Sequence, residues 1–487
     1  MSDWFLPATE RPWTSGNLVI PHVHGATYFE RLVEAIEATT AEDRIFLTDW
    51  RGDSDERLTA DGPTVGELLT AAGKRGVEVR ALLWRSHSDK GHLNAQENEH
   101  LGTLINESGG EAILDERVRR GGSHHQKLFV VRRKGRPAED AAFIGGIDLC
   151  HGRRDDADHR GDPQAPPLDK RYGDTPPWHD AMVEIRGPAV SHVLDTFAER
   201  WDDPTPVDHR NPYRALRHRL EHMPRHPEDL PQRWDPPPEA GPHQVQLLRT
   251  YPSKRPPYPF APEGERSVAR AYSRAFERAE RLVYIEDQYF WSDVVATTLA
   301  DALRSKPLLH VIAVVPRYPE EDNRVSGPPM IYGQRLAWEM LHAAGGDRFA
   351  MFDLENAAST PIYVHAKVCV VDDEWMTVGS DNLNLRSWTH DSELTCAIVD
   401  TDGELPRRLR TSLWAEHLGL PEDDPRLTDV AGALRLWTER SRAQQGRARP
   451  HVPDRLPART RAWARPAYRF LYDPDGRPRR LRGTTEF

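Results

Sequence analysis

Two short segments of this chain repeat one pattern of basic residues. Residues 123–131 read SHHQKLFVV and residues 363–371 read YVHAKVCVV, so a His-x-Lys pair occurs twice, 240 residues apart. The pairs are His125 with Lys127 and His365 with Lys367. Two imidazoles and two ammonium groups suffice to cleave a phosphodiester without a metal. One neutral imidazole attacks phosphorus, the other donates a proton to the leaving alkoxide, and the lysines stabilise the phosphate oxygens. Histidine suits both tasks because its pKa of about 6.5 lies near neutrality.

Small, polar and acidic residues follow each pair along the chain. We expect the paired small-residue turns to let the backbone approach phosphate and the hydroxyl and amide groups to support it. We also expect the carboxylates to orient the imidazoles through their second ring nitrogens. The residues alone leave open which carboxylate serves which imidazole and which imidazole attacks. The supporting residues are Gly145, Gly146 and Asp148 in the first copy, and Gly379, Ser380, Asn382 and Glu393 in the second.

Apolar neighbours predict that each His-x-Lys pair lies on a buried strand. Residues at i and i+2 of a strand share one face, so each histidine and lysine would project together. An unpaired buried ammonium is costly. Two such pairs at matched positions therefore favour a functional site over two structural core histidines. His124 falls on the opposite face and is interpreted as structural.

The elements that must position these residues are duplicated as well. Residues 26–50 and 267–291 each show a helical apolar pattern that leads into a strand, and a second helix and strand follow within 64–84 and 294–315. This alternation predicts two α/β/α halves, each a mixed sheet flanked by helices. Pseudo-twofold packing of the halves would bring both pairs to one active site.

Composition shifts divide the chain into four predicted parts. The N-terminal half spans 20–201, a Pro-rich linker spans 202–242, and the C-terminal half spans 243–420. An Arg- and Pro-rich extension follows over 421–487, in which residues 467–472 are predicted to add a strand. From residue 440 onward there are 13 Arg, no Lys and four acidic residues, a surface suited to anionic headgroups.

Bulk composition narrows the class of protein. The net charge of −11 disfavours nucleic acid as the main partner, and three cysteines without CxxC spacing indicate neither a disulfide scaffold nor structural zinc. No apolar run approaches the ~20 residues of a spanning helix, and the N-terminus lacks the layout of a secretory signal. We expect a cytoplasmic monomer that reaches the membrane only peripherally.

The pattern resembles the HxKxxxxD motif of the phospholipase D superfamily. The second copy fits it from His365 through Lys367 and Asp372 to Gly379-Ser380-x-Asn382, and segments 143–153, 177–180 and 284–290 look like those of eukaryotic-type phospholipases D. The resemblance implies that His125 is the nucleophile and His365 the general acid, with no metal or cofactor. It implies hydrolysis of glycerophospholipids at a membrane surface to phosphatidate and free alcohol, with water or an alcohol as acceptor.

The first copy departs from the motif in one place. Arg132 stands where the family has Asp, within an apparent hairpin insertion, and Asp140 is a candidate substitute. Three alternatives accompany the leading interpretation, and only the third rests on Arg132. They are a phosphatidyltransferase resembling cardiolipin synthases, a nuclease of the same superfamily, and a catalytically degenerate scaffold that binds lipid.

Overall fold

The computed structural model describes residues 3–86, 95–207, 216, 226–320, 325–400, 402–482, 484, 486 and 487. Residues 208–215 and 217–225 of the predicted linker lie outside this described part. The proposed domain boundaries remain a prediction.

The first half is built on a seven-stranded mixed sheet. Its strand order is β4-β3-β2-β5-β6-β8-β1, in which β2, β3 and β4 are parallel and the other pairs are antiparallel. Three helices pack on one face of this sheet and α4 (Ala189–Trp201) packs on the other. The strands are β1 (Trp13–Val23), β2 (Arg44–Asp49), β3 (Glu78–Trp84), β4 (Glu111–Asp115), β5 (Leu128–Arg132), β6 (Ala141–Gly145) and β8 (Ala181–Arg186), and the three helices are α1 (Gly25–Glu37), α2 (Val65–Lys74) and α3 (Ala95–Glu107).

The second half repeats this order strand for strand. Its sheet runs β13-β12-β11-β15-β16-β17-β9, again with three parallel strands at one end and antiparallel pairs elsewhere. Three helices cover one face, and α10 (Glu404–Leu418) and α11 (Ala433–Arg442) cover the other. The strands are β9 (His243–Tyr251), β11 (Leu282–Glu286), β12 (His310–Val314), β13 (Phe349–Glu355), β15 (Val368–Val371), β16 (Trp375–Gly379) and β17 (Glu393–Val399), and the three helices are α6 (Ser267–Arg278), α7 (Asp293–Ser305) and α8 (Gly327–Gly345).

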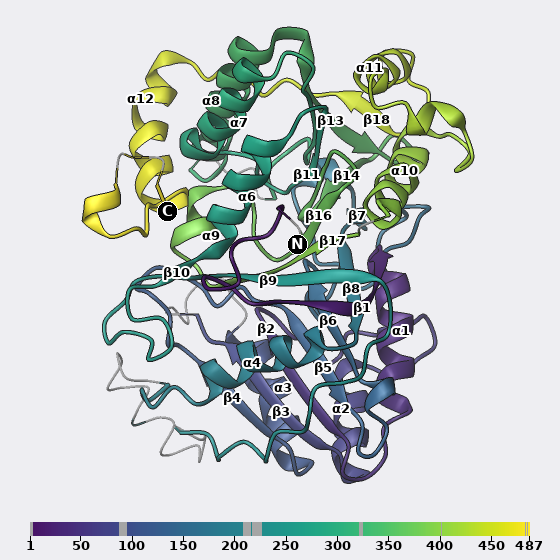
Figure 1. Ribbon diagram of the computed structural model, residues 1–487, viewed down its shortest axis with the longest axis vertical. Helices are drawn as coiled ribbons and strands as arrows, with labels where there is room; N and C mark the ends of the chain where they lie inside the picture. Colours follow the sequence, from purple (N-terminus) through teal and green to yellow (C-terminus); the bar gives the residue numbers. More distant parts are fainter. Residues whose placement is uncertain are drawn as a thin grey trace.

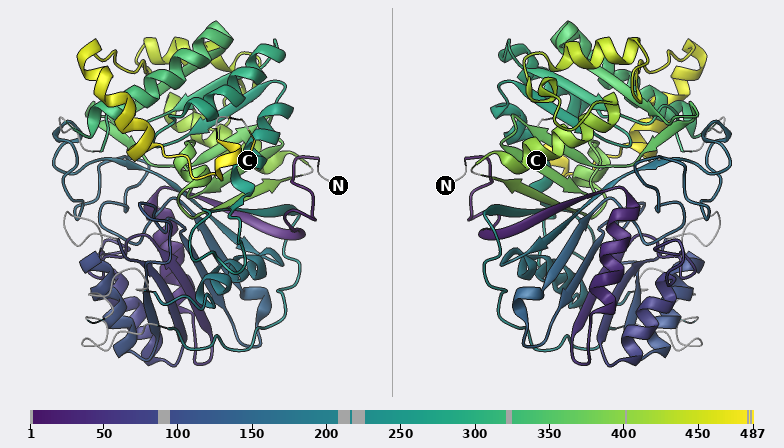
Figure 2. Two further views of the ribbon diagram at one scale, coloured as in Figure 1. Left: turned by 90° about the vertical axis from the view of Figure 1, so that its left-hand side faces the viewer. Right: turned by 90° about the vertical axis from the view of Figure 1, so that its right-hand side faces the viewer.

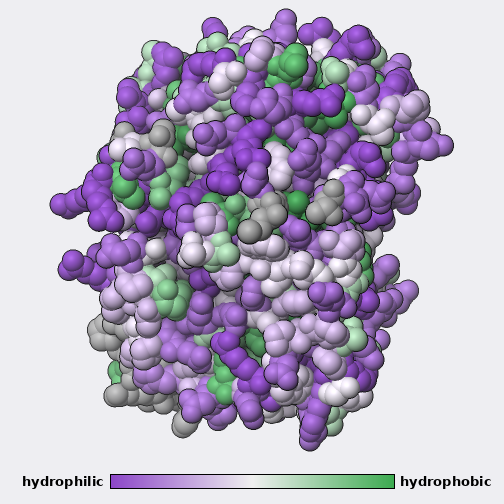
Figure 3. All heavy atoms as spheres, viewed as in Figure 1, coloured by the Kyte–Doolittle hydropathy of each residue, from purple (hydrophilic) through white to green (hydrophobic). Residues whose placement is uncertain are grey.

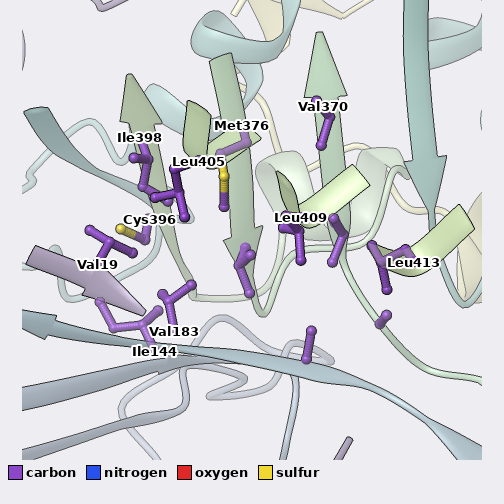
Figure 4. Close-up of a cluster of buried hydrophobic side chains, with 14 of the residues drawn as sticks. Val19, Ile144, Val183, Val370, Met376, Cys396, Ile398, Leu405, Leu409 and Leu413 are labelled. Atoms are coloured by element: carbon purple, nitrogen blue, oxygen red, sulfur yellow. The ribbon is translucent and has the colours of Figure 1, made fainter. Parts of the chain in front are cut away.

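The two sheets meet where the equivalent strands β1 and β9 pair antiparallel. Figures 1 and 2 show the first half, in purple and blue, below this junction and most of the second half, in green and yellow, above it. One hydrophobic cluster crosses the junction, and in Figure 4 Val19, Ile144 and Val183 of the first half face Cys396 and Ile398 of the second. The predicted fold class, two α/β/α halves, is confirmed.

Shorter elements complete the architecture. Two of them, β7 (Trp178–His179) and β14 (Pro361–Val364), pair in parallel and so cross between the halves. Another short strand, β18 (Ala448–Pro450), pairs with β13 and so extends the second sheet. The remaining pieces are β10 (Glu265–Arg266), α9 (Leu385–Thr389) and α12 (Ala458–Ala467).

The strand predicted at residues 467–472 is wrong. Residue 467 ends α12, and Tyr468–Tyr472 form a π-helical turn. Tertiary contacts favour this conformation, because the buried Tyr468 ring packs against Gly333 of α8 and its hydroxyl donates to Asp473, 2.9 Å away. Aromatic residues with strand propensity are thus used to dock a helix.

The surface carries polar side chains over most of the face seen in Figure 3. Among the described residues, no helix combines the length and apolar composition needed to cross a bilayer.

Candidate active site

Both His-x-Lys pairs lie just before a strand instead of within one. His125 and Lys127 precede β5, and His365 and Lys367 lie between β14 and β15, so the continuous strand predicted over 363–371 is wrong. The break has a clear cause. The backbone N–H groups of His365 and Ala366 both donate to His179 O of the other half, at 2.8 and 3.1 Å.

The two halves exchange contacts at these breaks. His125 N donates to Ser392 O at 3.0 Å, and His125 Nδ1 lies 2.8 Å from Glu393 Oε2, both in the second half. Conversely, His365 Nδ1 lies 2.6 Å from Asp180 Oδ2 of the first half. Each imidazole is therefore oriented by a carboxylate from the opposite half, which leaves its Nε2 available for chemistry.

The expectation that Asp148 orients an imidazole is wrong, because its carboxylate contacts a lysine. Asp148 Oδ1 lies 3.1 Å from Lys127 Nζ instead, and Asp180 takes the predicted orienting role at His365. The internal repeat could have identified Asp180 as the orienting residue. Gly145 pairs with Met182 and Gly379 pairs with Thr395, so Asp180 and Glu393 occupy equivalent positions two residues before these partners.

The lysines have different surroundings in the two halves. Lys127 has a carboxylate contact in Asp148, whereas Lys367 donates to His365 O and to Gln288 Oε1, the latter at 3.4 Å. The residue two positions after the small-residue turn is Asp148 in the first half and Asn382 in the second. Within the part of the chain that the structure describes, the buried Asn382 Oδ1 has no hydrogen-bond partner. The positive charge of the lysine is therefore less neutralised in the second half than in the first.

Burial and the clustered cations set the protonation states. Burial, with the charges of Lys127 and Lys367, holds the pKa of His125 well below its usual value, and burial with Lys367 and Arg153 does the same at His365. Burial lowers the pKa of Lys367 to about 8, and the Lys127 charge adds to this effect against the opposing Asp180. Both imidazoles are thus neutral near pH 7 in the free protein, and the cations repel each other. An anion placed among them would relieve that repulsion.

The carboxylates respond differently to the same burial. Burial and the charge of Asp391 raise the pKa of Glu393 to about 8, and burial also raises the pKa of Asp180. At Asp148 the Lys127 and Arg153 cations outweigh burial and lower the pKa. Ser380 Oγ also donates to Glu393 Oε2 at 2.6 Å, so the predicted supporting serine acts on the carboxylate beside His125.

The glycines of the two turns serve chain packing. A Cβ on Gly146 would lie 2.3 Å from Asp180 Oδ1, one on Gly145 would lie 2.4 Å from Ala181 O, and one on Gly379 would lie 2.3 Å from Thr395 Oγ1. Their missing side chains thus let the neighbouring strand and its orienting carboxylate lie close. The expected approach of this backbone to phosphate stays a prediction.

The motif acid Asp372 lies at the far end of β15 from Lys367. Its carboxylate accepts from the backbone N–H groups of residues 280–282, at 2.7 to 2.9 Å, and so fixes the entry to β11. Asp372 is therefore placed to act structurally, away from the imidazoles. About five strand residues, or ~15 Å, separate it from the lysine.

The same geometry explains the departure in the first copy. Arg132 pairs with Arg44 in the register position that Asp372 holds in the second half, so it too is remote from the histidine. Buried Arg132 contacts Asp140 at 2.6 Å, and Asp140 also accepts from Arg133 N. The lost acid is thus replaced by a buried ion pair, which leaves the surroundings of His125 and Lys127 intact.

Sequence reasoning assigned no role to two residues that shape the site. The Arg153 guanidinium lies 3.9 Å from the centroid of the Trp178 ring, and that ring lies 4.9 Å from the His365 ring. Arg153 is buried and adds a third cation beside Asp148 and Asp180. Both residues belong to segments quoted for the family resemblance, which was the available signal.

A pocket of about 560 Å³, lined mostly by residues of the second half, lies next to these groups. Gln288 and Tyr363 line it, and the Gln288 amide connects them, since Oε1 accepts from Lys367 and Nε2 donates to Tyr363 OH at 2.8 Å. The remaining lining includes Arg171, Arg317 and Tyr318. Gln288 therefore lies between this mixed polar and aromatic pocket and Lys367.

Comparisons with known proteins agree with this arrangement. The sequence model for Phospholipase D matches residues 40–211 and 350–444, a range that holds both His-x-Lys pairs and more than half of the chain. Phospholipase D beta 2 of Arabidopsis thaliana is 26% identical over 78% of this chain and 55% of its own length. Phospholipase D alpha 2 of Oryza sativa subsp. japonica is 27% identical over 83% of this chain and 66% of its own length. The chain thus spans 55 to 66% of the length of these curated relatives.

A solved structure extends the similarity in fold. The phosphatidylserine synthase of Haemophilus influenzae Rd KW20 superposes with a TM-score of 0.58 at 14% identity, covering 93% of this chain and 94% of that one. At this identity the likeness concerns the fold alone. The duplicated sheet, the crossed imidazole–carboxylate contacts and the family match together lead to one conclusion: this chain belongs to the phospholipase D family.

Proposed function

We propose that the chain is a phospholipase D-type phosphodiesterase that hydrolyses the distal phosphoester of glycerophospholipids to phosphatidate and free alcohol. One observation carries the proposal. Two imidazoles, His365 buried and His125 partly buried, are each held at Nδ1 by a carboxylate of the opposite half, and two lysines accompany them in one electrostatically coupled cluster. An anionic phosphodiester fits there because it neutralises cations that otherwise repel one another.

Catalysis follows from the protonation states of the free protein. Both imidazoles begin neutral, and a bound phosphodiester raises the affinity of each for a proton, so one becomes the acid while the other keeps its Nε2 lone pair. The neutral imidazole attacks phosphorus, and a P–N bond forms as the P–O bond to the alcohol breaks. The protonated imidazole gives its proton to the departing oxygen. Water, or an alcohol in the transfer reaction, then attacks the phosphohistidine with that second imidazole as base.

The family resemblance names His125 as the nucleophile and His365 as the acid. Their accessibility supports this assignment. The His125 side chain keeps 16% of its surface exposed, against 6% at His365. The more accessible ring suits attack on an incoming phosphorus, and the more enclosed ring suits retention of a proton.

A surface next to the site is suited to a membrane. We define the tail surface as the exposed side chains of Phe470 and Leu471, which keep 78% and 66% of their area, with the exposed arginines on either side of them in the sequence: Arg465, Arg469, Arg479, Arg480 and Arg482. Apolar side chains amid arginines match the interface of an anionic bilayer. Arg386 ties this surface to the site, because it donates to Leu471 O and to Asp391, whose carboxylate accepts from Ser123 N.

Trapping the intermediate tests the chemistry and the assignment together. Quenching turnover of radiolabelled phosphatidylcholine with alkaline denaturant should leave acid-labile, base-stable phosphate on His125, and His125→Ala should abolish both label and choline release. His365→Ala should slow release while the label still forms with a good leaving group. Label on His365, or turnover that persists in both variants, would overturn the proposal. Addition of 1-butanol tests transfer, which should yield phosphatidylbutanol.

A further inference from the structure

Three histidines and a glutamate form a second buried group between the halves. We call this group the His–Glu cluster: His24, His159, His179 and Glu416. One ring nitrogen from each histidine and one carboxylate oxygen all lie within 4.8 Å of one another. His24 precedes α1, His159 lies in the loop after β6, His179 ends β7, and Glu416 comes from α10 of the second half. The phosphodiesterase chemistry uses none of these side chains.

Contacts within the cluster converge on the glutamate. His24 Nε2 lies 2.8 Å from Glu416 Oε2, and His159 Nε2 lies 2.9 Å from Glu416 Oε1. The rings are packed together, with centroids 4.7 Å apart for His24 and His159 and 5.2 Å apart for His24 and His179. All three histidines are buried.

Two buried ring nitrogens of the cluster, His24 Nδ1 and His179 Nδ1, have no hydrogen-bond partner among the described residues. At His179 the opposite nitrogen is held by a carboxylate, since Nε2 lies 2.7 Å from Glu286 Oε2. Glu286 is itself fixed by His417 Nε2 at 2.8 Å and by the Tyr284 hydroxyl at 2.6 Å. An imidazole that donates one N–H to a carboxylate presents its other nitrogen as a metal ligand, so this arrangement prepares His179 for coordination.

Two of the histidines adopt backbone conformations that favour glycine. His24 has φ of 71° and ψ of 150°, and His159 has φ of 54°. Such conformations cost on the order of 1–3 kcal/mol in other residues and persist where surrounding structure demands them. Here they aim both imidazoles at Glu416. A glycine at either position would relieve the strain but remove the ligand.

We propose that the His–Glu cluster is a binding site for a divalent transition-metal ion, with Zn²⁺ as its natural occupant. Three imidazoles and one carboxylate are a ligand set that zinc takes in tetrahedral geometry. Neighbouring ligands of such an ion lie about 3.3 Å apart, so binding draws the cluster inward from its present separations. Glu416 keeps 17% of its side chain exposed, which supplies an entry path.

The positively charged side chain of Arg447 lies next to the proposed metal site. Arg447 Nη1 lies 2.6 Å from Glu416 Oε1, and it competes with the metal for that oxygen. Glu416 Oε2, which lies 2.8 Å from His24 Nε2, is the oxygen assigned to the ion. His159 Nδ1 donates to Trp178 O at 3.0 Å, so its Nε2 is the nitrogen that faces the metal.

The bound ion would join the halves next to the second His-x-Lys pair. The backbone carbonyl of His179 accepts from His365 N and Ala366 N, so a metal on the His179 ring fixes the segment that carries His365. The role assigned is structural. It is independent of the proposed reaction, in which no step uses this ion.

Metal binding by the full chain tests the site directly. The protein stripped with chelator should take up one Zn²⁺ per chain by mass spectrometric metal analysis, and Co²⁺ should give visible absorption bands typical of tetrahedral coordination. Zn²⁺ should also raise the thermal midpoint of the wild-type chain. Glu416→Gln should weaken Zn²⁺ at least about tenfold and remove the thermal shift.

His22→Ala is the matched control, since His22 is two residues from His24 but contacts Glu184, at 3.4 Å, outside the cluster. It should bind Zn²⁺ as the wild type does. A wild-type chain that takes up no stoichiometric Zn²⁺ and shows no thermal shift would overturn the proposal and leave a hydrogen-bonded network. Full uptake by folded Glu416→Gln would do the same. The wild-type titration decides the question even where a variant fails to fold.

Discussion

Replacing Asp180 by Asn removes one negative charge and changes almost nothing in size. Asp180 Oδ2 lies 2.6 Å from His365 Nδ1, and Oδ1 accepts from Ala181 N at 2.8 Å. Both oxygens therefore face N–H donors. An amide has only one oxygen, so each of its two orientations sets an NH₂ group against a donor. Packing of Asp180 on Gly146 leaves little room for the side chain to move away.

The magnitude follows from these contacts. A hydrogen bond to a charged group contributes about 1.5–3 kcal/mol, and a buried donor left unsatisfied costs about 1–3 kcal/mol more. If both act on the protonated His365 in the transition state, kcat should fall by about 10²- to 10⁴-fold. The largest effect is expected where the leaving group most needs a proton.

Two leaving groups separate this mechanism from a general loss of structure. Choline release from phosphatidylcholine should show the full defect in Asp180→Asn, whereas release of p-nitrophenol from phosphatidyl-p-nitrophenol should show a much smaller one. The control is Asp353→Asn, which breaks a matched buried contact, Asp353 Oδ2 to His451 Nδ1 at 2.9 Å, away from His365. Equal defects with both substrates, or a loss below tenfold with phosphatidylcholine, would refute the reasoning.

Three further outcomes follow from the same structure. Arg132→Leu leaves Asp140 buried without its cation, so the free energy of unfolding measured in urea should drop by about 3–5 kcal/mol. The kcat of the folded variant should stay within a few-fold of the wild-type value. A large loss of kcat would instead place Arg132 in the catalytic machinery. Lys367 is charged below its pKa of about 8 and neutral above it, so kcat/KM should decline as pH rises through 8, and a flat profile to pH 9.5 would contradict this. The double substitution Phe470→Ser and Leu471→Ser removes the apolar part of the tail surface. It should weaken binding to phosphatidylserine-containing vesicles at least about tenfold and spare hydrolysis of a soluble short-chain substrate. Unchanged sedimentation of the variant with vesicles would exclude this surface as the docking site.

Much of the architecture could be read from local patterns. The alternation of helical and strand periodicity appears twice, and the two sheets follow it strand for strand, because burial of apolar faces largely determines where strands and helices form. Where local propensity competed with tertiary contact, prediction failed. Residues 468–472 form a helical turn that packs Tyr468 on α8, and residues 365–367 leave the strand to bond with His179.

Local sequence was enough to predict the groups that we propose carry the chemistry: two histidines and two lysines at matched positions of a repeat. The partners of these groups depend on the tertiary structure. Asp180 lies 185 residues from His365, and Glu393 lies 268 residues from His125. These residues, far apart in the sequence, come into contact because β1 pairs with β9, which brings each motif against the opposite half. Local sequence specifies a side chain and its strand, but a contact between halves depends on how two completed sheets pack.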